Sequence, residues 1–154
     1  MKTMEWFTVD KSAWGDGPWQ SEVDKKQWRD KATGLMCLIH RGPSGALCGY
    51  VGIPEAHPLY GKDYEVPDVV VHGGLTYADK CMQTDDPAKG ICHIPDDGEH
   101  VDLWWFGFDC AHFGDVCPAY KQFNNMSHEG EAYKTIAYVQ RQVTDLAKQF
   151  NNMQ

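Results

Sequence analysis

The run Leu-Trp-Trp-Phe-Gly-Phe at residues 103–108 limits the possible folds more than any other segment. In a β-strand, successive side chains point to opposite faces, so this run would be apolar on both faces. A strand of that kind is expected at the centre of a sheet rather than at its edge. The chain must therefore provide further strands on either side of residues 103–108.

Short runs of strand-forming residues between turn signals are the candidates for those strands. Residues 35–39 and 46–53 are apolar and flank the turn sequence Gly-Pro-Ser-Gly at 42–45. Two such runs around a short turn predict a β-hairpin. The Val-Val-Val trio at residues 69–71 predicts another short strand, because β-branched residues favour strands.

A second pair of strands is expected near the middle of the chain. Residues 91–94 and 101–108 flank Pro-Asp-Asp-Gly at residues 95–98, which is a turn signal. Residues 78–90 are polar and rich in turn-forming residues, and no strand is predicted there.

The C-terminal segment carries an apolar stripe with spacings of three and four, formed by Ile136, Val139, Val143, Leu146 and Phe150. This periodicity predicts an amphipathic helix. Ser127 or His128, followed by Glu129, is expected near its start. We expect the stripe to cover one face of the sheet. The alternative is a seam between two copies of the chain, although the stripe is short for a coiled coil.

The length of 154 residues fits one domain. Residues 1–27 lack periodicity and are interpreted as an irregular, aromatic N-terminal arm whose tryptophans pack on the rest of the chain. Residues 28–154 are predicted to form a single α+β domain, with a mostly antiparallel sheet of four to six strands and a long C-terminal helix packed on it.

The charge balance excludes several classes of partner. The chain has 14 Lys and Arg against 22 Asp and Glu, for a net charge of −8. Binding to nucleic acid or to an anionic membrane needs a basic surface, so neither partner is expected. A small molecule or a host protein remains as the expected partner, and no oligomeric state is predicted.

The sequence also predicts a compartment. The N-terminus has no apolar signal region, which predicts a cytoplasmic protein. In a reducing compartment the six cysteines would be mostly buried free thiols.

The densest polar cluster follows the apolar run and has the spacing Asp-x-x-His-x-x-Asp, formed by Asp109, His112 and Asp115. In a helical turn, steps of three residues keep these side chains on one broad face. They could bind a divalent metal, or a carboxylate could orient His112 as a general base. The structural alternative is that both aspartates cap turns and His112 packs in the core.

A second polar cluster, residues 72–77, follows the predicted strand at 69–71. His72 is the candidate acid, base or ligand, Gly73 and Gly74 could hold an anion through their backbone, and Thr76 and Tyr77 could line a pocket. The alternative is a tight turn whose histidine donates to a carbonyl group. If the two preceding strands are neighbours, both clusters lie at one end of the sheet.

Two metal sites are compatible with these residues. His72, Asp109 and His112 could hold one zinc or manganese ion. Cys110, His112 and Cys117, completed by His72 or His93, would be a zinc site, but that spacing matches no common structural zinc pattern.

Residues 54–67 form a long predicted loop, and long loops in compact domains are often functional. His57, Tyr60, Lys62 and Tyr64 could close over a polar, partly aromatic ligand. The alternative is a solvent-exposed loop held by Pro58 and the tyrosines.

Four segments carry a resemblance to a known family: residues 48–54, 57–61, 72–77 and 104–112, including His-Gly-Gly-Leu-Thr-Tyr and Trp-Trp-Phe-Gly-Phe-Asp-Cys-Ala-His. With them the chain resembles, over about residues 28–145, a family of small uncharacterised proteins of bacteriophages and prophages. The resemblance implies a phage or prophage origin and a setting in the host cytoplasm. It implies no activity.

Two functional hypotheses follow. The first is a small hydrolase or lyase that acts on a polar, nucleotide-like small molecule, with or without a metal. In it, His112 is the general base or a metal ligand, Asp109 and Asp115 orient it, and His72 is the second acid or base. The second is a binding protein without turnover: a small-molecule sponge or an inhibitor of a host protein, in the setting of counter-defence.

Overall fold

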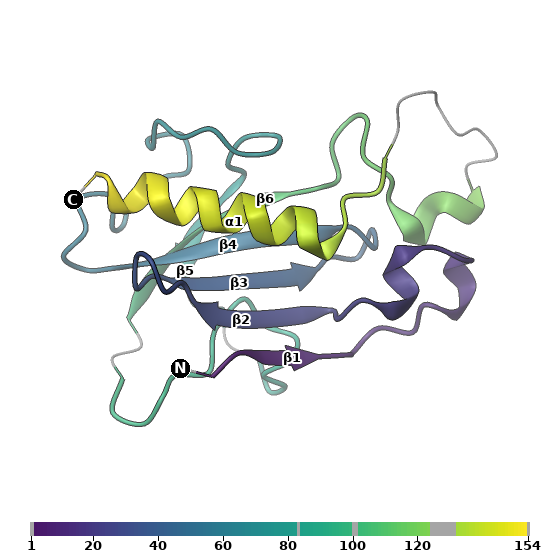
Figure 1. Ribbon diagram of the computed structural model, residues 1–154, viewed down its shortest axis with the longest axis horizontal. Helices are drawn as coiled ribbons and strands as arrows, with labels where there is room; N and C mark the ends of the chain where they lie inside the picture. The colour runs from purple at the N-terminus through teal and green to yellow at the C-terminus, as the bar shows by residue number, and fades with distance from the viewer. Residues whose placement is uncertain (1, 83, 100–101, 124–131, 154) are drawn as a thin grey trace.

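Six strands, joined only in antiparallel pairs, form the sheet that organises the molecule (Figure 1). The computed structural model describes residues 2–82, 84–99, 102–123 and 132–153. The strands are β1 (Met4–Trp6), β2 (Lys25–Arg29), β3 (Met36–Arg41), β4 (Leu47–Pro54), β5 (Tyr77–Lys80) and β6 (Leu103–Asp109). Their order across the sheet is β1-β2-β3-β4-β6-β5. Three short 3-10 helices, η1 (Ser12–Trp14), η2 (Pro18–Ser21) and η3 (Pro118–Phe123), lie in the described connections.

Two predictions about the strands are confirmed. The β3–β4 hairpin forms around the predicted turn, where Gly42 N donates to Ala46 O over 2.9 Å and Gly45 has φ +86°. The two-faced apolar run is β6, which lies inside the sheet between β4 and β5. Trp105 and Phe106, on its opposite faces, both have exposed fractions of 0%.

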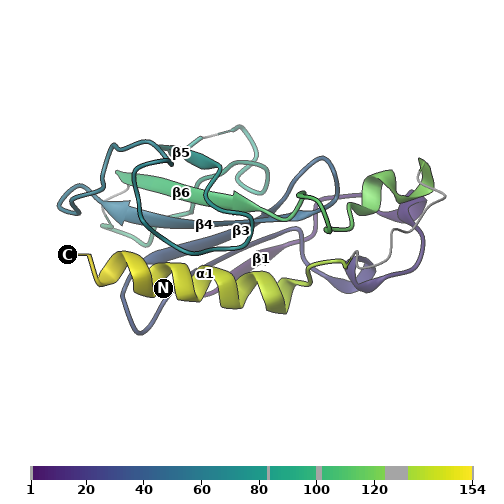
Figure 2. The same cartoon turned by 90° about the horizontal axis from the view of Figure 1, so that it is seen from above.

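The α-helix of the described chain, α1 (Ile136–Asn151), lies across one face of the sheet (Figures 1 and 2). Thr135 is its N-cap, and its side chain accepts a hydrogen bond from Tyr138 N. The predicted stripe faces the sheet, where α1 contacts β3 and β4. Val143 and Phe150 are fully buried, and the Phe150 ring stacks on Phe106 of β6. The intramolecular packing is thus confirmed. The predicted start at residues 127–129 lies outside the described residues.

Segment 81–99 covers part of the opposite face of the sheet. Lys25, on β2, is fully buried and donates through Nζ to the carbonyl oxygens of Pro87, Gly90 and Cys92. Beside it, the Gln27 amide donates to Ile94 O over 2.9 Å and accepts from Ile94 N over 2.7 Å. An apolar cluster of Met36, Leu38, Tyr50 and Trp105 lies on this face.

The predicted strands at residues 69–71 and 91–94 are wrong. In both segments, side chains form hydrogen bonds with backbone N–H and carbonyl groups that would otherwise pair with a neighbouring strand. At residues 69–71, the Gln149 side chain binds both the N–H and the carbonyl of Val70. Residues 91–94 form one isolated bridge, from Ile91 to Met82, and otherwise bind Lys25 and Gln27. The partner of β6 on that side is β5, which lies in the segment where no strand was predicted.

The N-terminal residues belong to the sheet. The predicted boundary at residue 27 falls inside β2, and β1 pairs with β2 in register from Met4↔Gln27 to Trp6↔Lys25. The sequence pattern does not indicate β2, because its buried positions include the polar residues Lys25 and Gln27 instead of apolar ones. The prediction of one α+β domain with a mostly antiparallel sheet and a C-terminal helix is confirmed.

The expectation of mostly buried cysteines without disulfides holds only in part: four of the six form no disulfide, and two of these are buried. Cys37 and Cys110 are buried, and Cys48 and Cys117 are half-buried. Cys81 and Cys92 instead form a disulfide, with 4.7 Å between their Cα atoms. The Met82–Ile91 bridge brings these neighbouring positions together.

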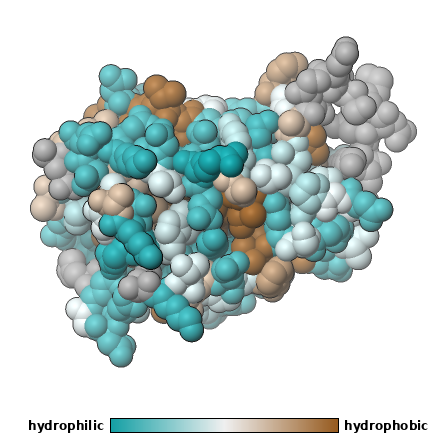
Figure 3. All heavy atoms as spheres, in the orientation of Figure 1, coloured by the Kyte–Doolittle hydropathy of each residue, from teal (hydrophilic) through white to brown (hydrophobic). Residues whose placement is uncertain are grey.

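The surface in the view of Figure 3 is largely hydrophilic, with hydrophobic residues in small separate patches. In the described part of the chain, no helix combines the length and the apolar character needed to cross a membrane.

Candidate functional site

The two predicted polar clusters meet beside the start of α1. His72 donates or accepts through both ring nitrogens: Nε2 lies 2.8 Å from Asp115 Oδ2, and Nδ1 lies 2.9 Å from the Tyr138 hydroxyl of α1. The backbone N–H of His72 also donates to the Gln142 side chain over 3.0 Å. His72 is thus held from three directions. The two clusters are in contact, but not as the ends of neighbouring strands, because residues 69–71 form no strand.

Asp115 is the buried anion of the cluster, with an exposed fraction of 9%. Besides His72, it accepts a hydrogen bond from His112 N over 3.1 Å, and its Oδ1 lies 3.3 Å from Lys134 Nζ. Its carboxylate therefore joins the 112–115 turn, the 72–76 segment and the residues before α1.

His112 is held differently from His72. Its Nδ1 lies 3.1 Å from both Asp109 Oδ1 and the Asp109 carbonyl oxygen. Thr76 Oγ1 donates to the other carboxylate oxygen of Asp109 over 3.0 Å. No described residue binds Nε2 of His112, and 35% of its side chain is exposed. One imidazole nitrogen therefore remains open to a ligand.

Gly73 makes this arrangement possible. Its φ is +69°, which L side chains rarely adopt, and a Cβ there would lie 2.5 Å from His112 Nδ1. Gly74 has φ +79°, and a Cβ at that position would meet no atom within 4 Å, so Gly74 borders open space. The glycine pair thus places the main chain against the imidazole on one side and leaves room on the other.

Three predicted ligand-binding residues, Tyr77, His57 and Tyr60, lie elsewhere. Tyr77 points to the opposite face of the sheet, where its ring packs edge-on against Tyr50 at 5.4 Å. His57 is buried, with Nε2 2.8 Å from Phe150 O and Nδ1 accepting from Leu59 N, so both nitrogens fix the loop to α1. The structure therefore does not support Tyr77 or His57 as a ligand contact.

The rest of the long loop is also tied to the sheet. The Tyr60 hydroxyl donates to Asp102 over 2.6 Å, and Trp104 Nε1 donates to Lys62 O over 2.9 Å. Residues 54–67 thus form a pinned loop, as in the structural alternative, and Tyr60 is not part of the cluster around His72.

The predicted metal site is not formed. In the part of the chain that the structure describes, no group of three or more His, Cys, Asp or Glu side chains could hold a metal ion. The reason is visible for the set His72, Asp109 and His112, because Asp115 and Tyr138 occupy both nitrogens of His72. The zinc alternative fails as well, since Cys110 is buried and His93 packs against Trp105 on the other face of the sheet.

Sequence reasoning missed Tyr138 and Lys134, which belong to this cluster. Tyr138 lies in α1 between two positions of the apolar stripe, and the helical pattern gives no indication that it binds His72. Lys134 precedes the helix and pairs with Asp115. Neither has a local signal, because their roles come from the placement of α1 against the 72–76 segment.

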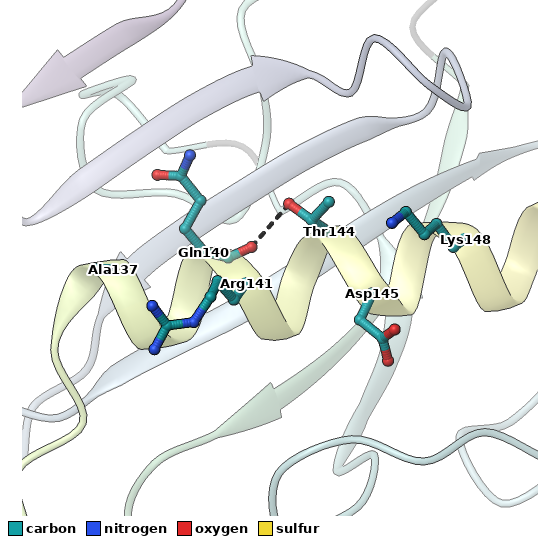
Figure 4. Close-up of a pocket in the computed structure, with 6 residues that line it drawn as sticks. All are labelled: Ala137, Gln140, Arg141, Thr144, Asp145 and Lys148. Carbon is teal, nitrogen blue, oxygen red and sulfur yellow. Dashed lines mark hydrogen bonds between the residues drawn. The ribbon is translucent and has the colours of Figure 1, made fainter.

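A hollow of about 530 Å³ runs along the outer flank of α1 and is lined by Ala137, Gln140, Arg141, Thr144, Asp145 and Lys148 (Figure 4). Gln140 and Asp145 leave the helix in different directions in that view. The Gln140 side chain accepts from Lys26 Nζ over 2.8 Å. None of the sequence-predicted site residues lies here.

In comparisons with known proteins, no family model, no curated protein and no solved structure matches the chain.

Proposed function

We propose that the His112–Asp109 pair is a proton-transfer site for a polar, nucleotide-like small molecule, as in a small hydrolase or lyase. The observation that carries the proposal is the asymmetry of His112. Its Nδ1 is held by Asp109, while Nε2 is unbound by described residues on a side chain that is 35% exposed. A carboxylate that orients an imidazole with one free nitrogen is a common arrangement for general base catalysis.

The proposed step uses His112 without a metal. With the Nδ1 proton donated to Asp109, the unprotonated Nε2 accepts a proton from water as the water oxygen attacks the substrate. The bond to the leaving group then breaks, and His112 Nε2 returns the proton to that group. In a lyase it would instead accept a proton from the substrate carbon next to the departing group. Thr76 keeps the Asp109 carboxylate in place. His72 and Asp115 act as positioning residues, because Asp115 accepts from the His112 backbone.

The glycine pair supports a ligand with an anionic group. Gly73 and Gly74 both have positive φ, at +69° and +79°, and Gly74 borders open space. Main chain without side chains allows a phosphate or carboxylate to come close to backbone N–H groups.

A binding protein without turnover is the second candidate. The observation that favours it is that His72 cannot act as the second acid or base while Tyr138 and Asp115 hold both of its nitrogens. A site with one free imidazole can bind a ligand without reacting with it. This candidate covers a small-molecule sponge or an inhibitor of a host protein, with a counter-defence role suggested by the resemblance to phage and prophage proteins.

The proposed setting is the host cytoplasm, on the basis of the same resemblance. The Cys81–Cys92 disulfide is the observation against it, because structural disulfides persist mainly in oxidising compartments.

The test measures the turnover rates of wild type, His112→Gln and Asp109→Asn. The substrates are a phosphomonoester, a phosphodiester, NAD, ADP-ribose and cyclic dinucleotides. Arg141→Ala, on the outer flank of α1, is the matched surface control. Loss of a general base is expected to reduce turnover by about 100-fold or more in His112→Gln. Arg141→Ala should keep the wild-type rate.

Native mass spectrometry of the purified protein separates the two candidates. A bound molecule that is recovered intact after denaturation, without turnover of any substrate, supports the binding protein. Turnover in His112→Gln at the wild-type rate would refute the enzyme, and unchanged ligand binding in that variant would refute the binding protein at this site.

A further inference from the structure

Residues 84–94, the cap, lie on the face of the sheet opposite α1 and are joined to the sheet by one covalent bond. That bond is the Cys81–Cys92 disulfide, and Cys81 directly follows β5. Cys81 and Ile91 pack against the apolar cluster formed by Met36, Leu38, Tyr50 and Trp105. The other four cysteines of the chain form no disulfide. Every other contact between the cap and the sheet is therefore noncovalent.

The main polar contact beneath the cap buries an ammonium group among neutral partners. Lys25 on β2 has an exposed fraction of 0%, and its Nζ donates to the carbonyl oxygens of Pro87, Gly90 and Cys92. Burial lowers the pKa of Lys25 to about 8, and the Asp86 carboxylate only partly opposes that effect. The closed cap thus disfavours the charged form of the side chain that holds it.

Two further polar groups on this face are buried without a hydrogen bond to any described residue. They are the Tyr77 hydroxyl and Trp105 Nε1. The His93 ring of the cap lies 5.6 Å from the Trp105 ring, and Tyr77 packs against the same apolar cluster as Ile91. Buried polar groups without partners destabilise the arrangement that buries them, whereas water would satisfy them if the cap were open. The closed cap therefore combines several unfavourable contributions.

The disulfide acts in the opposite direction. It keeps Cys92 beside the end of β5 and so limits the conformations available to an open cap, which favours the closed one. Cys81 and Cys92 are half-buried, at the border between the cap and solvent. Disulfides that a thiolate can approach are the ones that exchange with cellular thiols. An accessible bond thus stabilises an otherwise unfavourable arrangement.

We propose that the Cys81–Cys92 disulfide is a redox switch that controls access to this face of the sheet. A dithiol reductant attacks one sulfur as a thiolate, forms a mixed disulfide and then closes its own disulfide, which leaves both cysteines as thiols. The dithiol supplies the two electrons and the two protons of the new thiol groups. The cap then opens and exposes Lys25 and the apolar cluster to solvent. Exchange with an oxidised disulfide closes it again. The switch is independent of the proposed function at His112.

Amine acylation of the full chain, analysed by mass spectrometry, measures the opening at Lys25. Lys26 is the internal control, because it is the next residue of β2 but binds Gln140 of α1 on the other face of the sheet. Reduction with dithiothreitol should raise the acylation rate of Lys25 by about tenfold or more, as expected for local opening, and leave that of Lys26 unchanged. Reoxidation with oxidised glutathione should restore the slow rate.

Variants identify the bond through which the reductant acts. Cys81→Ser/Cys92→Ser should show the fast acylation of Lys25 without reductant, and dithiothreitol should change it no further. Cys117→Ser removes a half-buried cysteine outside the cap and should respond to dithiothreitol as wild type does. If the double variant does not fold, the wild-type measurement decides alone.

Hydrogen exchange at the backbone amides of the β3–β4 hairpin shows whether the rest of the fold is retained, and its protection should be the same in both redox states. The proposal is overturned if Lys25 reacts equally before and after the disulfide is cleaved, or if dithiothreitol leaves the bond intact in the folded protein. It is also overturned if reduction removes protection from the hairpin, because the bond would then hold the whole fold and not the cap. None of these outcomes involves His112, so the proposed function there would stand.

Discussion

Two histidines of the same cluster have different chemical capacities, and the difference lies in their partners. Both nitrogens of His72 are occupied, by Asp115 and the Tyr138 hydroxyl. Among the described residues, His112 has a partner for one nitrogen and none for the other. The sequence marks both residues as candidates and does not rank them, because the deciding contact is made by Tyr138, 66 positions away from His72.

Gly73 provides a test of how the His112 ring is positioned. In Gly73→Ala, the new methyl group would lie 2.5 Å from His112 Nδ1, so the ring must turn away from Asp109. Gly74→Ala is the matched control, because it has a similar positive φ but open space around its Cβ. Both variants should lose about 1–2 kcal/mol of stability from the left-handed backbone.

The difference should appear in the imidazole. In ¹H–¹³C NMR spectra, the His112 ring signals should move in Gly73→Ala and stay in place in Gly74→Ala. Equal spectra for the two variants would show that the glycine does not position the ring.

At the scale of elements, predictions based on apolar periodicity are confirmed for strands and helices that are stabilised mainly by burial of an apolar face. The β3–β4 hairpin, β6 and the stripe of α1 all bury apolar faces, so their periodicity is visible in the chain. The predictions failed where a distant polar side chain decides. Gln149 holds Val70 out of a strand, and Lys25 and Gln27 are buried in β2 through bonds to segment 87–94.

The close contact between α1 and β4 depends on Gly49, which has no side chain. A Cβ at Gly49 would lie 2.5 Å from Val143 Cγ2 and 2.6 Å from the Phe108 ring. Gly49→Ala should therefore push the helix from the sheet and destabilise the fold by about 1–3 kcal/mol, as overpacking does. Chemical denaturation measures the free energy of unfolding.

Val143→Ala removes one of the two clashing groups and supplies the control. The double variant Gly49→Ala/Val143→Ala should lose less stability than the sum of the two single variants, because the pair is in contact. Strict additivity would mean that Val143 does not limit how closely α1 approaches the sheet.

At the scale of the whole molecule, a buried ion network joins the N-terminal segment, the sheet and the helix. Arg41 on β3 is bound by Asp24 through Nε at 2.7 Å and by the Tyr133 hydroxyl at 2.8 Å. Asp24 also pairs with Lys11 at 2.7 Å. Glu22 accepts from Ile136 N, the first residue of α1, over 2.8 Å. These segments are distant in sequence, so only the folded chain assembles the network.

This network should make the fold sensitive to acid. Burial alone would raise the pKa of Asp24, but hydrogen bonds from Lys11, from the Thr8 and Val9 backbone and from Arg41 outweigh it and hold the pKa below its ordinary value of 3.8. A carboxyl group with a depressed folded pKa contributes stability that is present above the unfolded value and lost as the pH falls through the folded value. The contribution of Asp24 should therefore be complete above pH 3.8 and decline below it.

Chemical denaturation of wild type between pH 7 and pH 2, together with an NMR titration of the Asp24 carboxyl carbon, measures both sides of this linkage. The carboxyl carbon should titrate below 3.8, and the free energy of unfolding should fall over the same range. Asp24→Asn removes the titration and also leaves Arg41 and Lys11 buried without that anion, so it should be less stable at pH 7 and lose less further stability in acid. An Asp24 titration at or above 3.8 in the folded protein would contradict the prediction, because the network would then not favour the ionised carboxylate.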